Sequence, residues 1–385
     1  MTPTPVRTPV SMLDLKRQYA PIHNELLDAL NRVLVTQQFI LGSEVAAFER
    51  AAAEQLGVGH ALGCSSGTDA LWLALAAAGV GSGQAVVTTP FSFFASVSAI
   101  LRAGATPVLA DIDPVSFNLS PAAVNAVLDG PRGANVQAVL PVHLFGQISF
   151  DPGMGRERRL TVIEDAAQAW GAEWKGVKAG VLGDIAAFSF YPTKNLSAAG
   201  DAGMVTTNSD ELAERVKMLR QHGMRRRYSH DELGWNARMD GFQGAVLQVK
   251  LKYIDGWNEA RRAVAARYHA LFAQAGLAET GPYPVHGVVL PRELPGAKHV
   301  WHQYVIRAPR RDALREFLTE RGIGSEIYYP VPLHRQEALK SLGYTEGDFP
   351  EAERAAREVL ALPIFPELRE DEQQIVVAAI AEFLS

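Results

Sequence analysis

Short apolar runs of strand length alternate with helical segments through the middle of the chain. Four such runs are AVVTTP, TPVLADID, VQAVLPVHLFG and TVIEDAA. Turns rich in proline, asparagine and glycine separate them, as do helical stretches such as PAAVNAVLDG. Strands that alternate with helices are typical of a parallel sheet covered by helices on both faces. The pattern therefore predicts an α/β fold whose ligands bind beyond the carboxyl ends of the strands.

A lysine stands just beyond the end of another such run. The segment 185–190 is apolar and of strand length, Pro192 ends it, and Lys194 follows before a glycine-rich turn. A lysine in a loop is usually a solvated charge, but at the end of a strand it could also be a nucleophile. The neighbouring motifs decide between these interpretations.

Two further motifs suit an anion and a cationic ring. The segment CSSGTDALWLAL places Gly67 and Thr68 at the start of a helix, where free N–H groups and hydroxyls can bind a phosphate. The segment VIEDAAQAW places Asp165 at the end of a strand, where its carboxylate can hold a protonated ring nitrogen. Pyridoxal 5′-phosphate (PLP) needs a phosphate site, an acid and a lysine, so we expect this cofactor.

The order of these motifs resembles that of a known family. The segments SSGTDAL, EDAAQAWGA, FSFYPTKN followed by GDAG, and GWNARMDGFQGAVLQVKLKYI are similar to the motif series of the DegT/DnrJ/EryC1/StrS family of PLP-dependent sugar aminotransferases. The resemblance covers nearly the whole chain, from LDLKRQY to ALPIFPEL. It implies a fold type I transferase, a homodimer with shared active sites and a nucleotide-linked keto-sugar substrate.

The expected organisation has three parts. Residues 1–12 are expected to be a flexible tail, because three prolines and three threonines among the first ten residues pack poorly. Residues 13–250 form the expected large PLP-binding domain, with an N-terminal helical arm and a mostly parallel seven-stranded sheet flanked by helices. Residues 251–385 form the expected smaller α+β C-terminal domain, with strands around HQYVIRA and SEIYYP. A helix over about 241–275 is expected to link the two.

Lys194 and Asp165 are the expected catalytic residues. Gln168, three residues after Asp165, can donate a hydrogen bond to the phenolic oxygen of the cofactor. The resemblance implies that Phe93 stacks on the cofactor ring and that Ser189 binds its phosphate, although either could instead be a packing residue. The expected cofactor contacts are Gly67, Thr68, Phe93, Asp165, Gln168, Ser189, Lys194 and Asn236. His143 could line the site or be a core histidine, and we favour the core.

A basic and aromatic loop interrupts a mildly acidic chain. The loop MRRRYSHDELGWNARMDGF contains Arg225, Tyr228 and Asn236, whereas the chain carries a net charge of −5. A run of charge is usually a solvated face, but arginine forks also suit a pyrophosphate. In the resembled family this loop crosses to the neighbouring subunit, where the residue matching Asn236 meets the cofactor phosphate. Arg225 and Tyr228 are therefore expected substrate contacts.

A second expected substrate segment lies in the C-terminal part. YYPVPLHRQ resembles the family segment that closes over the substrate, which makes Tyr329 and His334 candidate contacts to the sugar nucleotide. Ile327 departs from the family pattern, which often has histidine there. The sugar-selecting contacts near it therefore do not follow from the resemblance.

The expected reaction moves an amino group from L-glutamate to a keto group of a nucleoside-diphosphate sugar, with Lys194 as general base and acid. DLKRQY, PVHLFGQ and RRYSHDELGWNARMD are more similar to members that act on 3-keto sugars, so C3 is favoured over C4. Amination of a keto-cyclitol or an aminoketone is an alternative. A regulatory or binding protein that keeps the fold is another, but it predicts loss of the lysine or the acid.

Composition also argues against nucleic-acid-binding, disulfide-stabilised and membrane-spanning proteins. The net charge of −5 gives no general attraction to nucleic acid. Cys64 is the only cysteine, so no internal disulfide can form and the cytoplasm is the default location. No apolar run reaches the ~20 residues needed to span a bilayer. We therefore expect no nucleic-acid partner, no membrane and no metal site.

Overall fold

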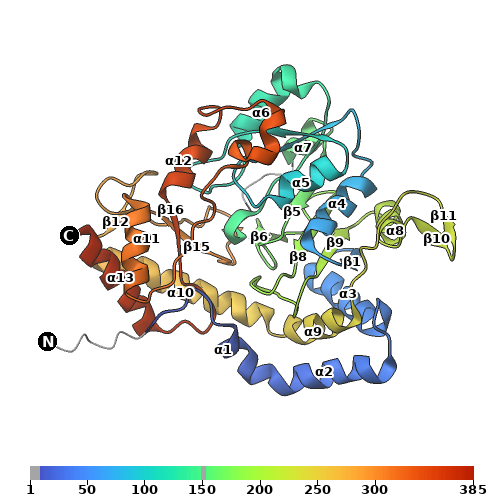
Figure 1. The fold of residues 1–385 in the computed structure, drawn as a ribbon, viewed down its shortest axis with the longest axis horizontal. Coiled ribbons are helices and arrows are strands. Elements are labelled where there is room, and N and C mark those ends of the chain that lie inside the picture. The colour runs from blue at the N-terminus through green and yellow to red at the C-terminus, as the bar shows by residue number, and fades with distance from the viewer. Residues whose placement is uncertain (1–8, 149–152) are drawn as a thin grey trace.

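A seven-stranded sheet forms the centre of a large lobe (Figure 1). The computed structural model describes residues 9–148 and 153–385. The strand order is β1-β9-β8-β5-β4-β2-β3, and every neighbouring pair from β8 to β3 is parallel, whereas β9 runs antiparallel to both of its neighbours. The strands are β1 (His60–Cys64), β2 (Ala85–Thr88), β3 (Thr106–Leu109), β4 (Val136–Val139), β5 (Thr161–Asp165), β8 (Ile185–Ser189) and β9 (Gly203–Thr207). The mostly parallel sheet expected from the sequence is confirmed.

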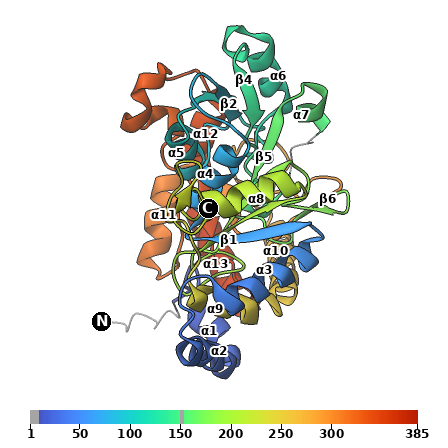
Figure 2. The ribbon, with the colours of Figure 1, turned by 90° about the vertical axis from the view of Figure 1, so that its right-hand side faces the viewer.

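Helices cover both faces of this sheet because its strands are apolar on both sides (Figures 1 and 2). One buried cluster joins the sheet to α4 and α5, and a second joins its other face to α3 and α9. The helices of this lobe and its arm are α1 (Leu15–Tyr19), α2 (His23–Thr36), α3 (Gly42–Leu56), α4 (Gly67–Ala77), α5 (Ala95–Arg102), α6 (Pro121–Asp129), α7 (Gly153–Glu157), α8 (Asp210–Leu219) and α9 (Gly241–Leu251).

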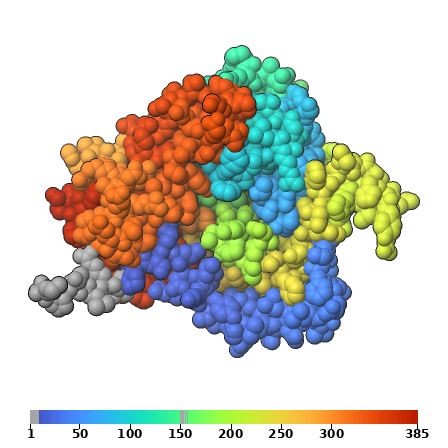
Figure 3. All heavy atoms as spheres, viewed as in Figure 1, coloured from blue at the N-terminus to red at the C-terminus, as the bar shows by residue number. Residues whose placement is uncertain are grey.

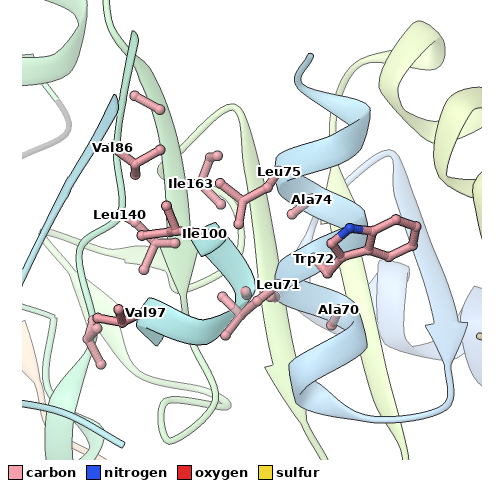
Figure 4. Close-up of a cluster of buried hydrophobic side chains, with 14 of the residues drawn as sticks. Ala70, Leu71, Trp72, Ala74, Leu75, Val86, Val97, Ile100, Leu140 and Ile163 are labelled. Atoms are coloured by element: carbon pink, nitrogen blue, oxygen red, sulfur yellow. The ribbon is translucent and has the colours of Figure 1, made fainter. Parts of the chain in front are cut away.

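Helix α4 is buried nearly all round, which explains why its sequence shows little polar face. Figure 4 shows Leu71 and Leu75 directed toward β-strand and α5 side chains, while Trp72 points to the opposite side. A helix enclosed in this way is fixed in position, and its N-terminus therefore has a defined place at the edge of the sheet.

A small lobe follows the linking helices. Its sheet has the order β12-β13-β15-β16. Its elements are α10 (Ile254–Gln274), β12 (Ala278–Glu279), β13 (Val288–Val289), β15 (Tyr304–Arg307), α11 (Arg311–Glu320), α12 (Pro350–Glu358), β16 (Val359–Leu362) and α13 (Glu370–Leu384). Short strands complete the fold: β6 (Glu173–Trp174) and β7 (Val177–Lys178) pair with β14 (Ala297–Lys298), and β10 (Met224–Arg226) pairs with β11 (Ser229–His230).

Three expectations need correction. The flexible tail expected over residues 1–12 is wrong for its last residues, because Val10 is buried and forms a parallel bridge with Ile323. Residues 1–8 lie outside the described residues. The linking helix over 241–275 is two helices, because tighter turn bonds at Lys252 and Tyr253 separate α9 from α10. The strand expected at SEIYYP is not formed, and only Glu326 bridges to β16.

The two lobes share one core. A single buried cluster contains strands and helices of the large lobe together with Leu333, Phe349 and Ala352 from the small lobe. Asp111 of the large lobe accepts hydrogen bonds from two amides at the start of α12, at 3.0 Å each. The amide of Leu109 donates to the hydroxyl of Tyr344 at 3.0 Å. The division at 250/251 stays a prediction. None of the helices in the described ranges is long and apolar enough to cross a membrane.

Truncation of the α4 core should destabilise the protein. Leu75 is fully buried between α4 and the sheet, so Leu75→Ala should lower the free energy of unfolding by about 2–5 kcal/mol through lost burial and a residual cavity. Urea denaturation followed by circular dichroism measures the change. Leu101→Ala on neighbouring α5 is the control, because Leu101 is 42% exposed and its loss should cost only about 0.5 kcal/mol. Equal losses in the two variants would contradict the packing of α4.

Candidate active site

The predicted catalytic and phosphate-binding segments meet at one edge of the sheet. Asp165 ends β5, Ser189 ends the neighbouring strand β8, and Lys194 follows β8 by five residues. β5 and β8 run parallel with Asp165 opposite Ala187, so their carboxyl ends lie side by side. The N-terminus of α4 packs against the same edge. The structure therefore brings together the acid, the lysine and the helix start.

The start of α4 has the form of an anion site. Ser66 caps the helix by accepting from the amide of Asp69 at 3.0 Å. Among the described residues, the amides of Gly67 and Thr68 have no hydrogen-bond partner. A Cβ atom at Gly67 would lie 2.5 Å from Cβ of Ser189, so only glycine allows this approach of helix and strand. Two free amides, a helix N-terminus and the Ser189 hydroxyl thus converge.

Asp165 is buried without a cation in contact with it. It is 4% exposed, and its carboxylate accepts from the Ser96 hydroxyl at 2.7 Å and from the Ala167 amide at 3.2 Å. Burial raises the pKa of this carboxyl group, while those two hydrogen bonds and the more distant charges of Lys194 and His143 act in the opposite direction. In the described part of the chain Asp165 forms no ion pair, so a protonated ring nitrogen would supply the missing positive charge.

Lys194 has a free amine with a lowered proton affinity. Its side chain is half-buried, and no other described residue forms a hydrogen bond or ion pair with its amine. Burial lowers the pKa of Lys194 from 10.5 to about 8, and the charge of Asp165 only partly opposes this. A large fraction of the amine is therefore neutral, and hence nucleophilic, in weakly alkaline solution.

An aromatic wall stands beside these groups. Tyr329 comes from the small lobe, and its ring lies 6.2 Å from Phe91 and 6.4 Å from Phe93. Phe91 is fully buried, whereas Phe93 is 60% exposed and has a face free to cover a ligand ring. Burial and the nearby charge of Asp165 raise the pKa of Tyr329. Gln168 accepts from the amide of Phe145 at 2.6 Å and donates to the Tyr329 hydroxyl at 3.4 Å.

The two histidines that the sequence singled out, His143 and His334, are both buried. His143 is 2% exposed and shares a 2.8 Å hydrogen bond with Glu164, which fits the core interpretation that the sequence favoured. His334 is 3% exposed, lies 3.0 Å from a carboxylate oxygen of Glu353 and packs edge-on against Phe349. A substrate contact by His334 stays a prediction, and in this conformation the ring offers almost no accessible surface.

The basic loop projects away from the body of the chain (Figures 1 and 3). Arg225 pairs with Asp231 at 3.0 Å, Tyr228 is 80% exposed, and Asn236 accepts from Arg238 at 3.0 Å. The structure of one chain does not bring these residues to Lys194. Their expected roles therefore depend on a neighbouring subunit.

The returning limb of that loop is fixed to α4. Arg102 bonds to Asp69 at 2.5 Å and lies over two tryptophan rings, 4.7 Å from Trp72 and 5.4 Å from Trp235. Asp69 also accepts from the hydroxyls of Ser65 and Ser66 beside the helix start. The loop base and the anion site are thus parts of one network.

Some site residues carry no signal in the sequence. Ser96 is one of several serines in FSFFASVSA, and only the fold shows that it bonds to Asp165. Asn195 and His302 are separated by more than a hundred residues and become neighbours only in the structure. Asn195 belongs to the motif FSFYPTKN around Lys194, but the sequence does not reveal its hydrogen-bond partners.

This combination of a doubly covered, mostly parallel sheet, a lysine beyond a strand end and a helix-start anion site defines an α/β transferase of fold type I. The model of the DegT/DnrJ/EryC1/StrS aminotransferase family matches residues 21–381, and the chain belongs to this family of enzymes. A crystal structure of S. venezuelae DesV in complex with a ketimine intermediate superposes with a TM-score of 0.91 at 40% identity, and the match covers 98% of this chain and 99% of that one.

Two curated relatives match over almost their full lengths. A protein of Geobacillus stearothermophilus named as a pleiotropic regulatory protein is 48% identical over 97% of this chain and 98% of its own. A UDP-N-acetyl-3-dehydro-α-D-glucosamine 3-aminotransferase of Acidithiobacillus ferrooxidans is 40% identical over 98% of each chain.

The reactivity of Lys194 should follow its lowered pKa. In cofactor-free protein, reductive methylation of Lys194 should rise with a midpoint at about pH 8, and Asp165→Asn should move the midpoint lower, because the carboxylate stabilises the ammonium form. Peptide mass spectrometry across a pH series measures the extent of modification. A methylation midpoint near pH 10.5 in the wild type would contradict a lowered pKa of Lys194. A higher midpoint in Asp165→Asn than in the wild type would contradict stabilisation of the ammonium form by the carboxylate.

Proposed function

We propose that the protein is a PLP-dependent aminotransferase that moves an amino group from L-glutamate to C3 of a nucleoside-diphosphate-linked 3-keto sugar. The observation that carries this proposal is the pairing of an unbonded, low-pKa lysine with a buried carboxylate that lacks a contacting cation. The 3-aminotransferase of A. ferrooxidans supports C3 over C4. The identity of the nucleotide stays open.

The residues present fit PLP. Gly67, Thr68 and Ser189 would hold its phosphate, Asp165 its protonated ring nitrogen, and Gln168 its phenolic oxygen. The exposed face of Phe93 would cover the ring. When bound, PLP supplies an aldehyde for the amine and a ring that accepts electrons from the substrate.

Different side chains would then transfer the proton, stabilise the ring nitrogen and exclude water. Lys194 would take a proton at Nζ from Cα of the amino donor and return it to the cofactor carbon that receives the amino group, because its lowered pKa leaves a large fraction of the amine neutral in weakly alkaline solution. Asp165 would remain ionised against the ring nitrogen of bound PLP and would keep that nitrogen protonated. Phe93 and Tyr329 exclude water on one side of the reacting atoms.

The site also requires a second copy of the chain. Helix α2 and the turn after it expose an apolar face that a partner could cover, and the loop exposes Leu233 and Trp235. The exposed residues of the α2 face are Leu27, Leu34, Val35, Phe39 and Ile40. In the proposed homodimer, the partner subunit's Asn236 reaches the cofactor phosphate, while its Arg225 and Tyr228 join Tyr329 and His334 around the sugar nucleotide. The cytoplasmic location stays a prediction.

A regulatory role is the second candidate, because the relative from G. stearothermophilus is named as a regulatory protein. Lys194 and Asp165 favour turnover, since a purely regulatory protein needs neither group. Amination of a keto-cyclitol or an aminoketone uses the same cofactor site and differs only in the acceptor.

An absorption experiment tests the cofactor and the donor. Protein saturated with PLP should show the absorption of lysine-bound cofactor near the visible edge, and L-glutamate should remove it because the amine is transferred. Lys194→Ala should bind PLP without forming that band. A nucleoside-diphosphate 3-keto sugar should restore the band, whereas the 4-keto isomer and free keto-cyclitols should not. A saturated wild type that stays colourless would favour the regulatory alternative.

A complementation experiment tests the shared site. Lys194→Ala and Asn236→Ala are each expected to have little activity. When the two variants are co-expressed, a mixed dimer would contain one site with both defects and one intact site. Activity should therefore recover to about one quarter of wild type if half of the dimers are mixed. If Asn236 acts within its own chain, both sites of a mixed dimer are defective, and no recovery would be seen.

A further inference from the structure

The residue after the reactive lysine is held more tightly than the lysine itself. Asn195 is 4% exposed, and its side-chain amide makes three hydrogen bonds. Its Nδ2 donates to Oδ1 of Asn258 at 2.8 Å and to the carbonyl of Val300 at 2.9 Å, and its Oδ1 lies 3.0 Å from Nδ1 of His302. Lys194 is thus attached to an anchored neighbour, although its own amine is free.

The directions of these hydrogen bonds follow from their partners. The carbonyl of Val300 can only accept, so Asn195 must present its NH₂ group there and its oxygen to His302. His302 must therefore carry a proton on Nδ1. The orientation of Asn258 is fixed in the same way, because its Nδ2 donates to the carbonyl of Trp170 at 2.9 Å. Two backbone carbonyls thus determine the tautomer of a histidine beside the lysine loop.

His302 is held as a neutral ring. It is 8% exposed, and burial, followed by the positive charge of Lys194, lowers its pKa well below the usual value. Its Nδ1 proton is used by Asn195, and its Nε2 carries none. The ring therefore serves as a fixed donor and is not arranged to move protons.

The anchors of Asn195 come from parts of the chain that also set the rest of the site. Asn258 lies on α10, and His302 lies in the segment before β15. That segment is bonded to the turn at Phe145, through the amide of Gln303 at 3.3 Å, and the amide of Phe145 in turn holds Gln168. A shift of this segment would therefore displace both Lys194, through Asn195, and Gln168, through Phe145.

We infer that His302 and Asn195 are positioning residues for Lys194: the Nδ1–H of His302 fixes Asn195, and Asn195 fixes the loop from which the lysine delivers its proton. This inference rests on the aminotransferase function proposed above. It adds two residues that touch neither the cofactor nor the substrate in that proposal. Neither residue acts as an acid or a base.

Two substitutions at one position separate positioning from packing. Asparagine places an amide N–H near the position of histidine Nδ1, whereas glutamine places it one bond further away. His302→Gln should therefore lower kcat by roughly 10- to 100-fold, because the lysine is misplaced. The KM for L-glutamate should stay unchanged, because the residues that bind the substrate are not affected. His302→Asn should retain kcat within about 3-fold of the wild type. His299→Asn is the matched control, because His299 is equally buried, stacks on Trp301 at 3.9 Å and forms no hydrogen bond with Asn195.

Two readouts on cofactor-free protein do not depend on turnover. Nitrogen-15 NMR of the histidine rings should show His302, assigned by its absence in His302→Gln, as the Nδ1–H tautomer with no titration between about pH 6 and 9. Amide hydrogen exchange of residues 194–198 should quicken in His302→Gln and remain slow in His302→Asn and His299→Asn.

Several results would overturn the inference. They are an Nε2–H tautomer, unchanged exchange in His302→Gln, and an equal loss of kcat in His302→Gln and His299→Asn. If the wild type fails to transfer an amino group from L-glutamate, the proposed function fails, but the tautomer and the exchange rates still decide whether His302 and Asn195 hold the lysine loop.

Discussion

A carboxylate removed from water needs a positive partner, and Asp165 has none in contact among the described residues. The charges of Lys194 and Asp165 influence each other's pKa, but the two side chains form no hydrogen bond or ion pair. Burial therefore acts on both groups at once, favouring the neutral amine and leaving the acid uncompensated. A cationic ring bound against Asp165 would compensate the charge of the acid and would further favour the neutral form of the amine. The helix start, the aromatic wall and the Gln168 amide are all arranged around this one electrostatic deficit.

The sheet creates this arrangement by bringing strand ends together. Asp165 ends β5, and Lys194 lies five residues beyond the end of the neighbouring parallel strand β8, so the spacing between these strands sets where the lysine loop begins relative to the acid. Gly67 lets α4 approach β8 closely, and the enclosed α4 keeps that approach constant. Small backbone constraints therefore set the position of the α4 start, the candidate anion site, relative to the lysine loop.

Local patterns were sufficient for the sheet, for Lys194 beyond its strand and for the start of α4, because strand length, proline and a run of small residues leave clear marks. Contacts between distant segments leave none. Nothing in the neighbourhood of His302 indicates Asn195 as its partner, and no spacing indicates that Val10 pairs with Ile323. The break between α9 and α10 was missed because residues 241–275 keep a helical composition throughout. The loop with Asn236 lies between these cases: its composition is unusual, but the contacts proposed for it require a second copy of the chain.

The core shared by the lobes also affects how the protein loses its structure. Phe349 and Ala352 belong to the same buried cluster as the helices over the main sheet, and Asp111 caps α12 from across the boundary. Detaching the small lobe would expose apolar surface on both sides and remove the cap of α12. The free-energy difference between detachment of one lobe and complete unfolding is therefore small. The two lobes should melt as one cooperative unit, and a half-unfolded form should remain a minor species even near the transition temperature.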